Sequence, residues 1–276
     1  MLYVCPTPIG NLEDITLRVL RTLKEADLIA AEDTRHTLKL LRHYSIETPL
    51  ISLHEHNEAA RIELLLEQLK GGKKIALVSD AGTPGISDPG RLLINAVIAA
   101  GLPCTVLPGP NAAVTAYVQS GLPDDRFLFY GFLPRKGKHR EEELAKLAQV
   151  PYAVVFYEAP HRLVETLQDL HRSFGDRTAS VSRELTKAFE ETIRGTLAEL
   201  AAHFQAQPPR GEFVITVAGR ADTEKTLGEE ITEGDIKRAL RELLDTGTTK
   251  KAAVRLVAEQ YRLPKNLVYK LALELD

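Results

Sequence analysis

Residues 75–90 read Ile-Ala-Leu-Val-Ser-Asp-Ala-Gly-Thr-Pro-Gly-Ile-Ser-Asp-Pro-Gly. The first four form a short apolar run that is typical of a buried strand. The loop that follows, Ser79–Gly90, combines three glycines with two prolines. These residues permit a close backbone approach with preset dihedral angles, and they carry little side-chain bulk. The stretch therefore predicts a buried strand that ends in a ligand-facing loop.

Two further apolar runs end in the same way. Leu2–Cys5 is followed by Pro6–Asn11, and Cys104–Leu107 is followed by Pro108–Asn111. In an open parallel sheet, the loops that leave the carboxyl ends of the strands line the ligand crevice. The three loops together predict a small-molecule site. Ser79–Gly90 lacks the lysine of a Walker A loop and the spacing of a dinucleotide fingerprint. We therefore expect the ligand to be neither a nucleotide triphosphate nor a dinucleotide.

The first 120 residues alternate strand-like and helix-like segments, which favours an N-terminal α/β domain (1–120) with a mostly parallel sheet covered on both faces. The predicted strands are Leu2–Cys5, Leu28–Ala31, Leu50–Leu53, Ile75–Val78 and Cys104–Leu107. The predicted helices are Ile15–Ala26, Thr37–His43, Glu58–Lys70, Arg91–Ala100 and Asn111–Ser120.

Residues 121–221 have a different pattern. Lys187–Gly195 alternates, with Phe189, Glu191 and Ile193 on one face, as in a half-exposed antiparallel strand. We expect a second α/β domain with a mixed sheet. Its predicted strands are Phe127–Tyr130, Ala153–Tyr157, Ala179–Ser182, Ala188–Arg194 and Phe213–Ala218.

The last part, 229–276, has a purely helical pattern. Asp235–Asp245, Thr249–Tyr261 and a third helix that begins at Pro264 fit a helix-turn-helix-like arrangement. Nine acidic and nine basic residues balance in this segment, so charge does not decide between nucleic-acid contact and a helical dimerisation tail.

The composition is that of an ordinary globular chain. It has 276 residues, 44% of them hydrophobic, and a net charge of −3, which gives no global nucleic-acid signature. Cys5 and Cys104 are expected to be buried thiols in a reducing compartment, and no metal-ligand spacing is present. The chain starts directly with a strand and contains no apolar run long enough to span a bilayer, so we expect a cytoplasmic protein without a membrane segment.

Polar clusters follow several of the predicted strands. Ala31–Thr37 carries six adjacent polar side chains of both charge signs, which suit either acid–base work or a helix cap with a surface ion pair. Phe156–Arg162 and Ser182–Lys187 repeat the pattern in the second half of the chain. Their charged side chains either have a functional role or form structural ion pairs. Pro134–Arg140 has five basic residues among seven and is either a solvated loop or a phosphate-contacting patch.

These motifs, taken in order, closely resemble those of the tetrapyrrole methylase family over residues 1–220. The segments that carry the resemblance are Pro6–Thr16, Ala31–Arg35, Ser79–Gly90, Pro108–Ala112, Tyr157–Arg162 and Arg183–Lys187. The resemblance implies a class III S-adenosylmethionine (SAM)-dependent methyltransferase. In such an enzyme two α/β domains enclose the cofactor in the cleft between them, usually in a homodimer, and no metal is required.

The resemblance also assigns cofactor contacts by matching motif positions. These positions are Pro8, Ile9, Gly10, Gly82, Thr83, Pro84, Ile86, Ser87, Ala112, Ala113, Glu158 and Leu185. Pro6 and Pro8 stand where the corrin- and haem-making members have glycines, and Thr83 replaces the aspartate of their Gly-Asp-Pro loop. These departures fit the branch that methylates the ribose 2′-hydroxyl of a cytidine in 16S ribosomal RNA, so the expected partner is that RNA or the 30S subunit.

A ribose hydroxyl is a poor nucleophile until its proton is removed, so a general base is expected. The candidate proton acceptors are Glu32, Asp33 and Glu184, of which we expect Asp33 to act. The candidates for holding phosphates or polarising the hydroxyl are Arg35, Arg183 and Lys187. The alternatives are a small-molecule methyltransferase of the tetrapyrrole type and a ligand-sensing helix-turn-helix DNA-binding regulator. The basic loop and the terminal helices favour the RNA substrate.

Overall fold

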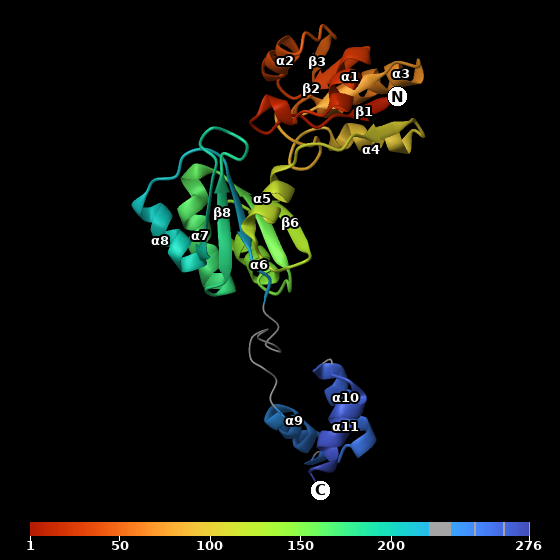
Figure 1. Cartoon of the computed structure of the whole chain (residues 1–276). Helices are drawn as coiled ribbons and strands as arrows, with labels where there is room; N and C mark the ends of the chain where they lie inside the picture. The colour runs from red at the N-terminus through yellow and green to blue at the C-terminus, as the bar shows by residue number, and fades with distance from the viewer. Residues whose placement is uncertain (221–232, 246, 262, 276) are drawn as a thin grey trace. The chain divides into compact units, whose positions relative to one another are not determined.

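The computed structural model describes residues 1–220, 233–245, 247–261 and 263–275. Met1–Arg220 forms one compact unit, and the described residues after it belong to a second. The first unit contains two sheets (Figure 1). The division of this unit into domains at residues 120 and 121 stays a prediction. Within the described ranges, no helix combines the length and the apolar character that crossing a membrane requires.

The first sheet is wholly parallel, with strand order β3-β2-β4-β1-β5. Its strands are β1 (Leu2–Val4), β2 (Leu28–Ala31), β3 (Leu50–Ser52), β4 (Ile75–Val78) and β5 (Cys104–Val106). Its helices are α1 (Leu17–Glu25), α2 (Thr34–His43), α3 (Glu58–Lys70) and α4 (Arg91–Ala99), with a short 3-10 turn, η1, at Leu12–Asp14. The expected strand–helix alternation is confirmed.

Helices cover both faces of this sheet because alternate strand residues point to opposite sides. In β4, Ala76 and Val78 pack in a core with residues of α1 and α2. Ile75 and Leu77 pack on the other side with residues of α3 and α4. All the strands run in the same direction, so the loops after β1, β2 and β4 emerge at one edge of the sheet.

The second sheet is mixed, as expected, with order β6-β7-β10-β8-β9; β6 and β7 are parallel and the other pairs are antiparallel. Its strands are β6 (Phe127–Phe132), β7 (Ala153–Glu158), β8 (Thr178–Arg183), β9 (Glu191–Thr196) and β10 (Phe213–Val217). Its other elements are α5 (Ala112–Ser120), α6 (Lys138–Leu147), η2 (Pro160–Arg162), α7 (Leu163–Phe174) and α8 (Leu197–Ala206). One face packs on α6–α8 and the other on α5 (Figure 1).

The strand predicted at Ala188–Arg194 is wrong at its start, because β9 begins at Glu191. The preceding residues form tight turns instead: Lys187 N–H donates to the Glu184 carbonyl, and Glu190 N–H donates to that of Lys187. Phe189 is therefore 79% exposed and does not share a face with Ile193. Side-chain alternation cannot distinguish a strand from a turn that happens to alternate.

Two other expectations need correction. Cys5 is buried, but it follows β1 rather than lying within it. Cys104 is only half-buried, because β5 is an edge strand with a neighbour on one side. Both thiols are free.

The described residues of the second unit contain three helices: α9 (Glu233–Asp245), α10 (Lys250–Gln260) and α11 (Lys265–Leu273). Their apolar faces share one small core, which includes Leu240, Val257 and Val268. The three predicted helices are confirmed. The start of the predicted segment, residues 229–232, lies outside the described residues.

Candidate functional site

Hydrogen bonds hold the three Pro/Gly-rich loops together at the carboxyl edge of the first sheet. Thr7 and Gly82 exchange both backbone N–H···O bonds, at 2.9 and 3.0 Å. The Thr83 hydroxyl donates to the Pro110 carbonyl at 3.2 Å. Gly82 has a φ of +77°, a region that residues with a side chain rarely adopt. The three loops that the sequence singled out therefore form one structure.

A buried carboxylate fixes the far end of the second loop. Glu58 is 4% exposed, and its Oε1 accepts N–H bonds from Gly90 at 3.1 Å and Leu93 at 3.0 Å. These donors belong to the first turn of α4, where a negative charge is favourable. Glu58 thus caps α4 from α3 and closes the loop Ser79–Gly90.

The first loop also contacts the second half of the unit. Asn11 N–H donates to the Thr186 hydroxyl at 3.1 Å. Gly10 lies so close to this segment that a Cβ atom would stand 2.9 Å from the Leu185 carbonyl and would also overlap Lys187. A glycine is needed here because backbone approaches backbone.

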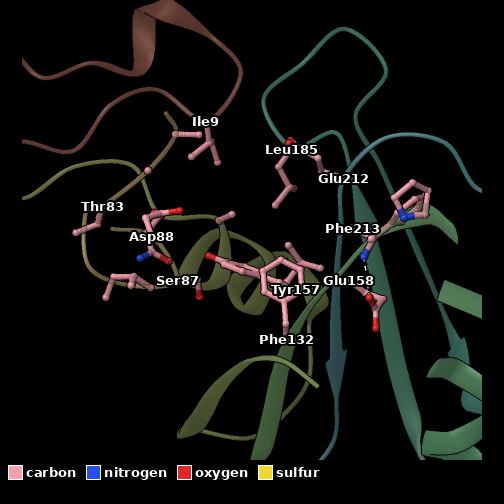
Figure 2. Close-up of a pocket in the computed structure, with 18 residues that line it drawn as sticks. Ile9, Thr83, Ser87, Asp88, Phe132, Tyr157, Glu158, Leu185, Glu212 and Phe213 are labelled. Atoms are coloured by element: carbon pink, nitrogen blue, oxygen red, sulfur yellow. Dashed lines mark hydrogen bonds between the residues drawn. The ribbon is translucent and has the colours of Figure 1, made fainter. Parts of the chain in front are cut away.

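A pocket of about 320 Å³ opens between these loops and the second sheet (Figure 2). Residues of the first half form one wall and residues of the second half form the other. The first wall includes Ile9, Gly82, Thr83, Ile86, Ser87 and Asp88, and the second includes Phe132, Tyr157, Glu158, Leu185, Glu212 and Val214. The volume is typical of a small-molecule site.

Aromatic rings and one carboxylate give this pocket its chemical character. Phe132 is 53% exposed and packs edge-on against Tyr157, with ring centroids 5.7 Å apart. The Tyr157 hydroxyl points toward Asp88 in Figure 2. Burial, and then the negative charge of Glu32, raise the pKa of Asp88 to about 6. Burial likewise raises the pKa of Tyr157 to about 12.

Most of the predicted cofactor-binding residues lie at this pocket. Eight line it: Ile9, Gly82, Thr83, Ile86, Ser87, Ala112, Glu158 and Leu185. Ala113 is buried and packs in one cluster with Leu185 and Val214, which line the pocket. Pro84 is buried and is not among the lining residues of the described pockets. Pro8 and Gly10 line the neighbouring pocket instead.

This second pocket has a volume of about 600 Å³ and shares Ile9, Ala81 and Glu212 with the first, so the two adjoin. It is more polar, and its walls come from the first loop, α2 and the start of the loop after β4. Besides Pro8 and Gly10, its lining includes His36, Thr37, Lys39, Asp80 and Lys187. It therefore suits a larger, charged molecule.

Three predicted catalytic residues lie around the start of α2. Asp33 is the N-cap of this helix: its Oδ1 accepts Arg35 N–H at 2.8 Å, and its Oδ2 pairs with the Arg35 guanidinium at 2.8 Å. The bonds from Arg35 hold the pKa of Asp33 well below its usual range. Glu32 accepts Asp80 N–H at 3.2 Å, and burial raises its pKa. The helix cap with its ion pair is therefore present, and the acid–base role of this segment stays a prediction.

The other three lie at the end of β8 and just after it. Arg183 pairs with Glu191 at 2.8 Å. Lys187 contacts Glu184 at 3.1 Å and Glu212 at 2.8 Å. Burial alone would raise the pKa of Glu184, but the Glu212 N–H and Lys187 together lower it. Of the six predicted catalytic residues, Lys187 alone lines either of these two pockets in the described structure.

A buried polar network holds Glu158, which lines the first pocket. Thr166 donates to Glu158 at 2.6 Å, and Arg140 donates to Thr166 at 2.9 Å and to Asp169 at 2.7 Å. Arg140 is 5% exposed. One of the five basic residues of Pro134–Arg140 therefore has a structural role, and the loop offers fewer free charges than its sequence indicated.

Sequence reasoning missed Asp88, Phe132, Tyr157 and Glu212 as pocket residues. Asp88 lies in the loop that was singled out, and Tyr157 opens the motif Tyr157–Arg162, so a signal was present for both. Phe132 reaches the pocket after a β-bulge between Phe129 and Gly131. The glycine inside this strand was the signal that could have marked the bulge.

Residues 1–201 match the family model described as Tetrapyrrole (Corrin/Porphyrin) Methylases. The chain belongs to the tetrapyrrole methylase family. Residues 230–276 match a second model, the RsmI C-terminal HTH domain, which confirms the helix-turn-helix expectation. Two curated relatives in the family are each called Ribosomal RNA small subunit methyltransferase I. The protein from Synechocystis sp. is 47% identical, covering 100% of this chain and 98% of its own. The protein from Bacillus subtilis is 46% identical, covering 98% and 92%.

Solved structures of tetrapyrrole methylases and related enzymes share the fold. Uroporphyrin-III C-methyl transferase from Thermus thermophilus, complexed with S-adenyl homocysteine, superimposes with a TM-score of 0.56 at 21% identity, covering 78% of this chain and 96% of its own. Diphthine synthase gives a TM-score of 0.62 at 14% identity, covering 79% and 89%. Both confirm the two-sheet architecture.

SAM is the methyl donor that this family implies, and the residues of the first pocket fit it. The apolar side chains Ile9, Ile86 and Leu185, with the ring of Phe132, can cover the adenosine. Gly82 brings backbone close to the pocket without a side chain. The carboxylate of Asp88 complements a ligand that carries positive charge at its sulfonium and amino groups.

Proposed function

We propose that this protein is a SAM-dependent methyltransferase that methylates the 2′-hydroxyl of a cytidine ribose in 16S ribosomal RNA. The observation that carries the proposal is the pocket between the two sheets, built by the family's loops in a chain that matches ribosomal RNA methyltransferases over nearly its whole length. Uroporphyrin-type substrates are less well supported, because the C-terminal helical unit matches the RsmI domain.

The first pocket holds the cofactor. Ile9, Gly82, Thr83, Ala112 and Leu185 provide its walls from both halves of the unit. SAM supplies an activated methyl group, so holding donor and acceptor in line provides much of the rate. The loop hydrogen bonds and the capped α4 make the cofactor wall rigid before binding, which serves this purpose.

The chain must also accept the proton of the ribose hydroxyl. Glu32, Asp80 and Asp88 lie within electrostatic reach of one another, and burial together with mutual repulsion raises the pKa of Glu32 and of Asp88. A carboxylate with a raised pKa is a better base near neutral pH than one with a lowered pKa. We propose that the acceptor belongs to this group, and we keep Asp33 as the competing candidate.

Single-turnover kinetics distinguish the two candidates. Asparagine can still cap α2, so Asp33→Asn preserves the helix. A methyl-transfer rate lowered by about 100-fold, with unchanged SAM and 30S affinity, would identify Asp33 as the base. A change of only a few-fold, together with a large loss of the single-turnover rate in Asp88→Asn at saturating SAM, would assign the proton to the Glu32–Asp80–Asp88 group.

Glu184 stays a candidate proton acceptor, while Arg35, Arg183 and Lys187 keep their proposed role of holding phosphates or polarising the hydroxyl. Each is held in an ion pair that RNA could exchange or share. The α11 surface, with exposed Lys265 and Lys270, is proposed to contact RNA or the subunit.

We also propose a homodimer in the cytoplasm. Val114 and Val118 project from one exposed face of α5, at 48% and 73% exposure, and Val106 on the edge strand β5 is 56% exposed. Exposed aliphatic side chains on an edge strand and a helix face are suited to a self-complementary contact. Sedimentation analysis tests the assembly.

The decisive test of the activity is transfer of labelled methyl from SAM to 30S subunits lacking the modification, followed by mapping of the modified nucleotide. We expect a single labelled ribose 2′-oxygen on a cytidine. Label on uroporphyrinogen, or on a base instead of a ribose, would refute the proposal.

A further inference from the structure

Helix α2 carries an unusual concentration of positive charge. Five of its ten residues are basic or histidine, and none is acidic: Arg35, His36, Lys39, Arg42 and His43. At about 100° per residue they fall within an arc of roughly 120°. All five are exposed, whereas Thr37, Leu40 and Leu41 on the opposite side are buried. The helix therefore presents one basic face to solvent.

Most of this charge is not neutralised within the protein. Arg35 is paired with Asp33. In the part of the chain that the structure describes, neither Lys39 nor Arg42 lies within ion-pair distance of a carboxylate. A solvated face that only kept the protein soluble would be expected to mix both charge signs. The basic face of α2 is therefore suited to an anionic partner.

This face runs directly into the second pocket. His36 and Lys39 belong to both, and the pocket adjoins the cofactor pocket through Ile9, Ala81 and Glu212. A molecule in the second pocket would thus lie beside the cofactor while its extensions crossed α2. The volume, about 600 Å³, is within the range of sites that enclose a small organic group.

One buried side chain in this pocket lacks a partner. Thr37 is 2% exposed and lines the pocket, and its hydroxyl makes no hydrogen bond in the structure. A helical threonine ordinarily bonds the carbonyl four residues earlier, yet here the Asp33 carbonyl accepts the Thr37 N–H alone. A buried hydroxyl without a partner is unfavourable unless a ligand or an ordered water completes it.

We propose that the second pocket holds the acceptor nucleotide and that the basic face of α2 binds the phosphates that flank it. This inference rests on the proposed function, since it names the substrate's binding site. The nucleotide is unstacked from its neighbours to reach the pocket, where the Thr37 hydroxyl bonds its sugar or base. Lys39 and Arg42 bind the backbone, which is the sequence-independent part of RNA recognition.

The test compares three variants in binding to 30S subunits and to a single-stranded RNA oligonucleotide over a range of salt concentrations. Lys39→Ala/Arg42→Ala removes two charges from α2 with good helix formers. Lys70→Ala/Lys73→Ala removes two exposed charges beside the amino end of β4, at the opposite edge of the sheet, as the matched control. Thr37→Val removes only the hydroxyl. SAM affinity and thermal unfolding are measured for each.

We expect Lys39→Ala/Arg42→Ala to weaken RNA binding by about 10-fold or more at low salt, and to reduce the slope of log K against log salt by about 1.4, or 0.7 for each phosphate contact. The control should stay within about twofold. Thr37→Val should lower kcat/KM for 30S methylation by about 5-fold with an unchanged salt slope, the scale of one neutral hydrogen bond. SAM affinity should not change in any of them.

Equal RNA affinity and salt slope in the α2 variant and the control would overturn the proposal. So would weaker 30S binding with unchanged oligonucleotide binding, because α2 would then contact a ribosomal protein. A wild-type protein that binds RNA through α2 but transfers no methyl would refute the proposed function and leave the binding site standing. The two failures are therefore distinguishable.

Discussion

Asp88→Asn should make the protein more stable at neutral pH while weakening its hold on SAM. In the folded chain the pKa of Asp88 is raised from 3.8 to about 6, because burial and the charge of Glu32 disfavour its ionised form. When folding raises the pKa of an acidic group, the folded state is favoured as long as that group is protonated. That stability is fully present below pH 4 and is lost as the pH rises through 6.

The magnitude follows from the pKa change. A rise of this size corresponds to about 3 kcal/mol at pH 7, at 1.36 kcal/mol per pH unit. Asp88 is only half-buried, so solvent screens part of this, and we expect a loss of about 1–2 kcal/mol. Asparagine carries no charge and therefore avoids this loss of stability. The unfolding midpoint of Asp88→Asn should therefore exceed that of the wild type by roughly 2–8 °C at pH 7.5, and the difference should vanish near pH 4.

The assay is thermal unfolding without SAM at pH 4, 6 and 7.5, paired with calorimetric titration of SAM. The positive charge of the cofactor favours an ionised Asp88, so wild-type binding near pH 6 should release a proton and the variant should bind about 10-fold more weakly. An unfolding midpoint for Asp88→Asn at or below that of the wild type at pH 7.5 would refute the reasoning, as would unchanged SAM affinity.

Two further substitutions test the framework of the site. Among the described residues, Arg140→Met leaves the buried Asp169 with only the exposed Arg172 as an ion-pair partner. The free energy of unfolding in urea should therefore fall by about 3–5 kcal/mol, and Asp169→Leu in the same chain should recover part of this loss. An unchanged urea midpoint would contradict the network. Gly82→Val should abolish SAM binding in a folded protein, measured by calorimetry and circular dichroism. The reason is the φ of +77° rather than crowding, since a Cβ there would lie 3.5 Å from Ile9; wild-type affinity would dismiss the loop as a cofactor wall.

The sequence by itself determined the elements of this protein and the loops that form its site. β2, β4 and α3 have the bounds that apolar periodicity predicted, because these patterns depend on neighbours within one segment. The loop Ser79–Gly90 was identified for the same reason: its glycines and prolines act on local dihedral angles. The motif order then named the family, and eight of twelve assigned cofactor positions line the pocket.

Only the tertiary structure decided which charged groups are free to act. In sequence, Asp33 fitted either a base or a helix cap, and Arg140 fitted either a phosphate contact or a solvated loop. The structure shows that Asp33 caps α2 and that Arg140 lies in a buried network. Asp88 read as a loop residue, yet burial beside Glu32 changes its pKa. Burial, pairing and charge repulsion are set by residues distant in the chain, so no local pattern encodes them. The same holds for Thr37, whose missing partner is visible only once α2 is packed against the pocket.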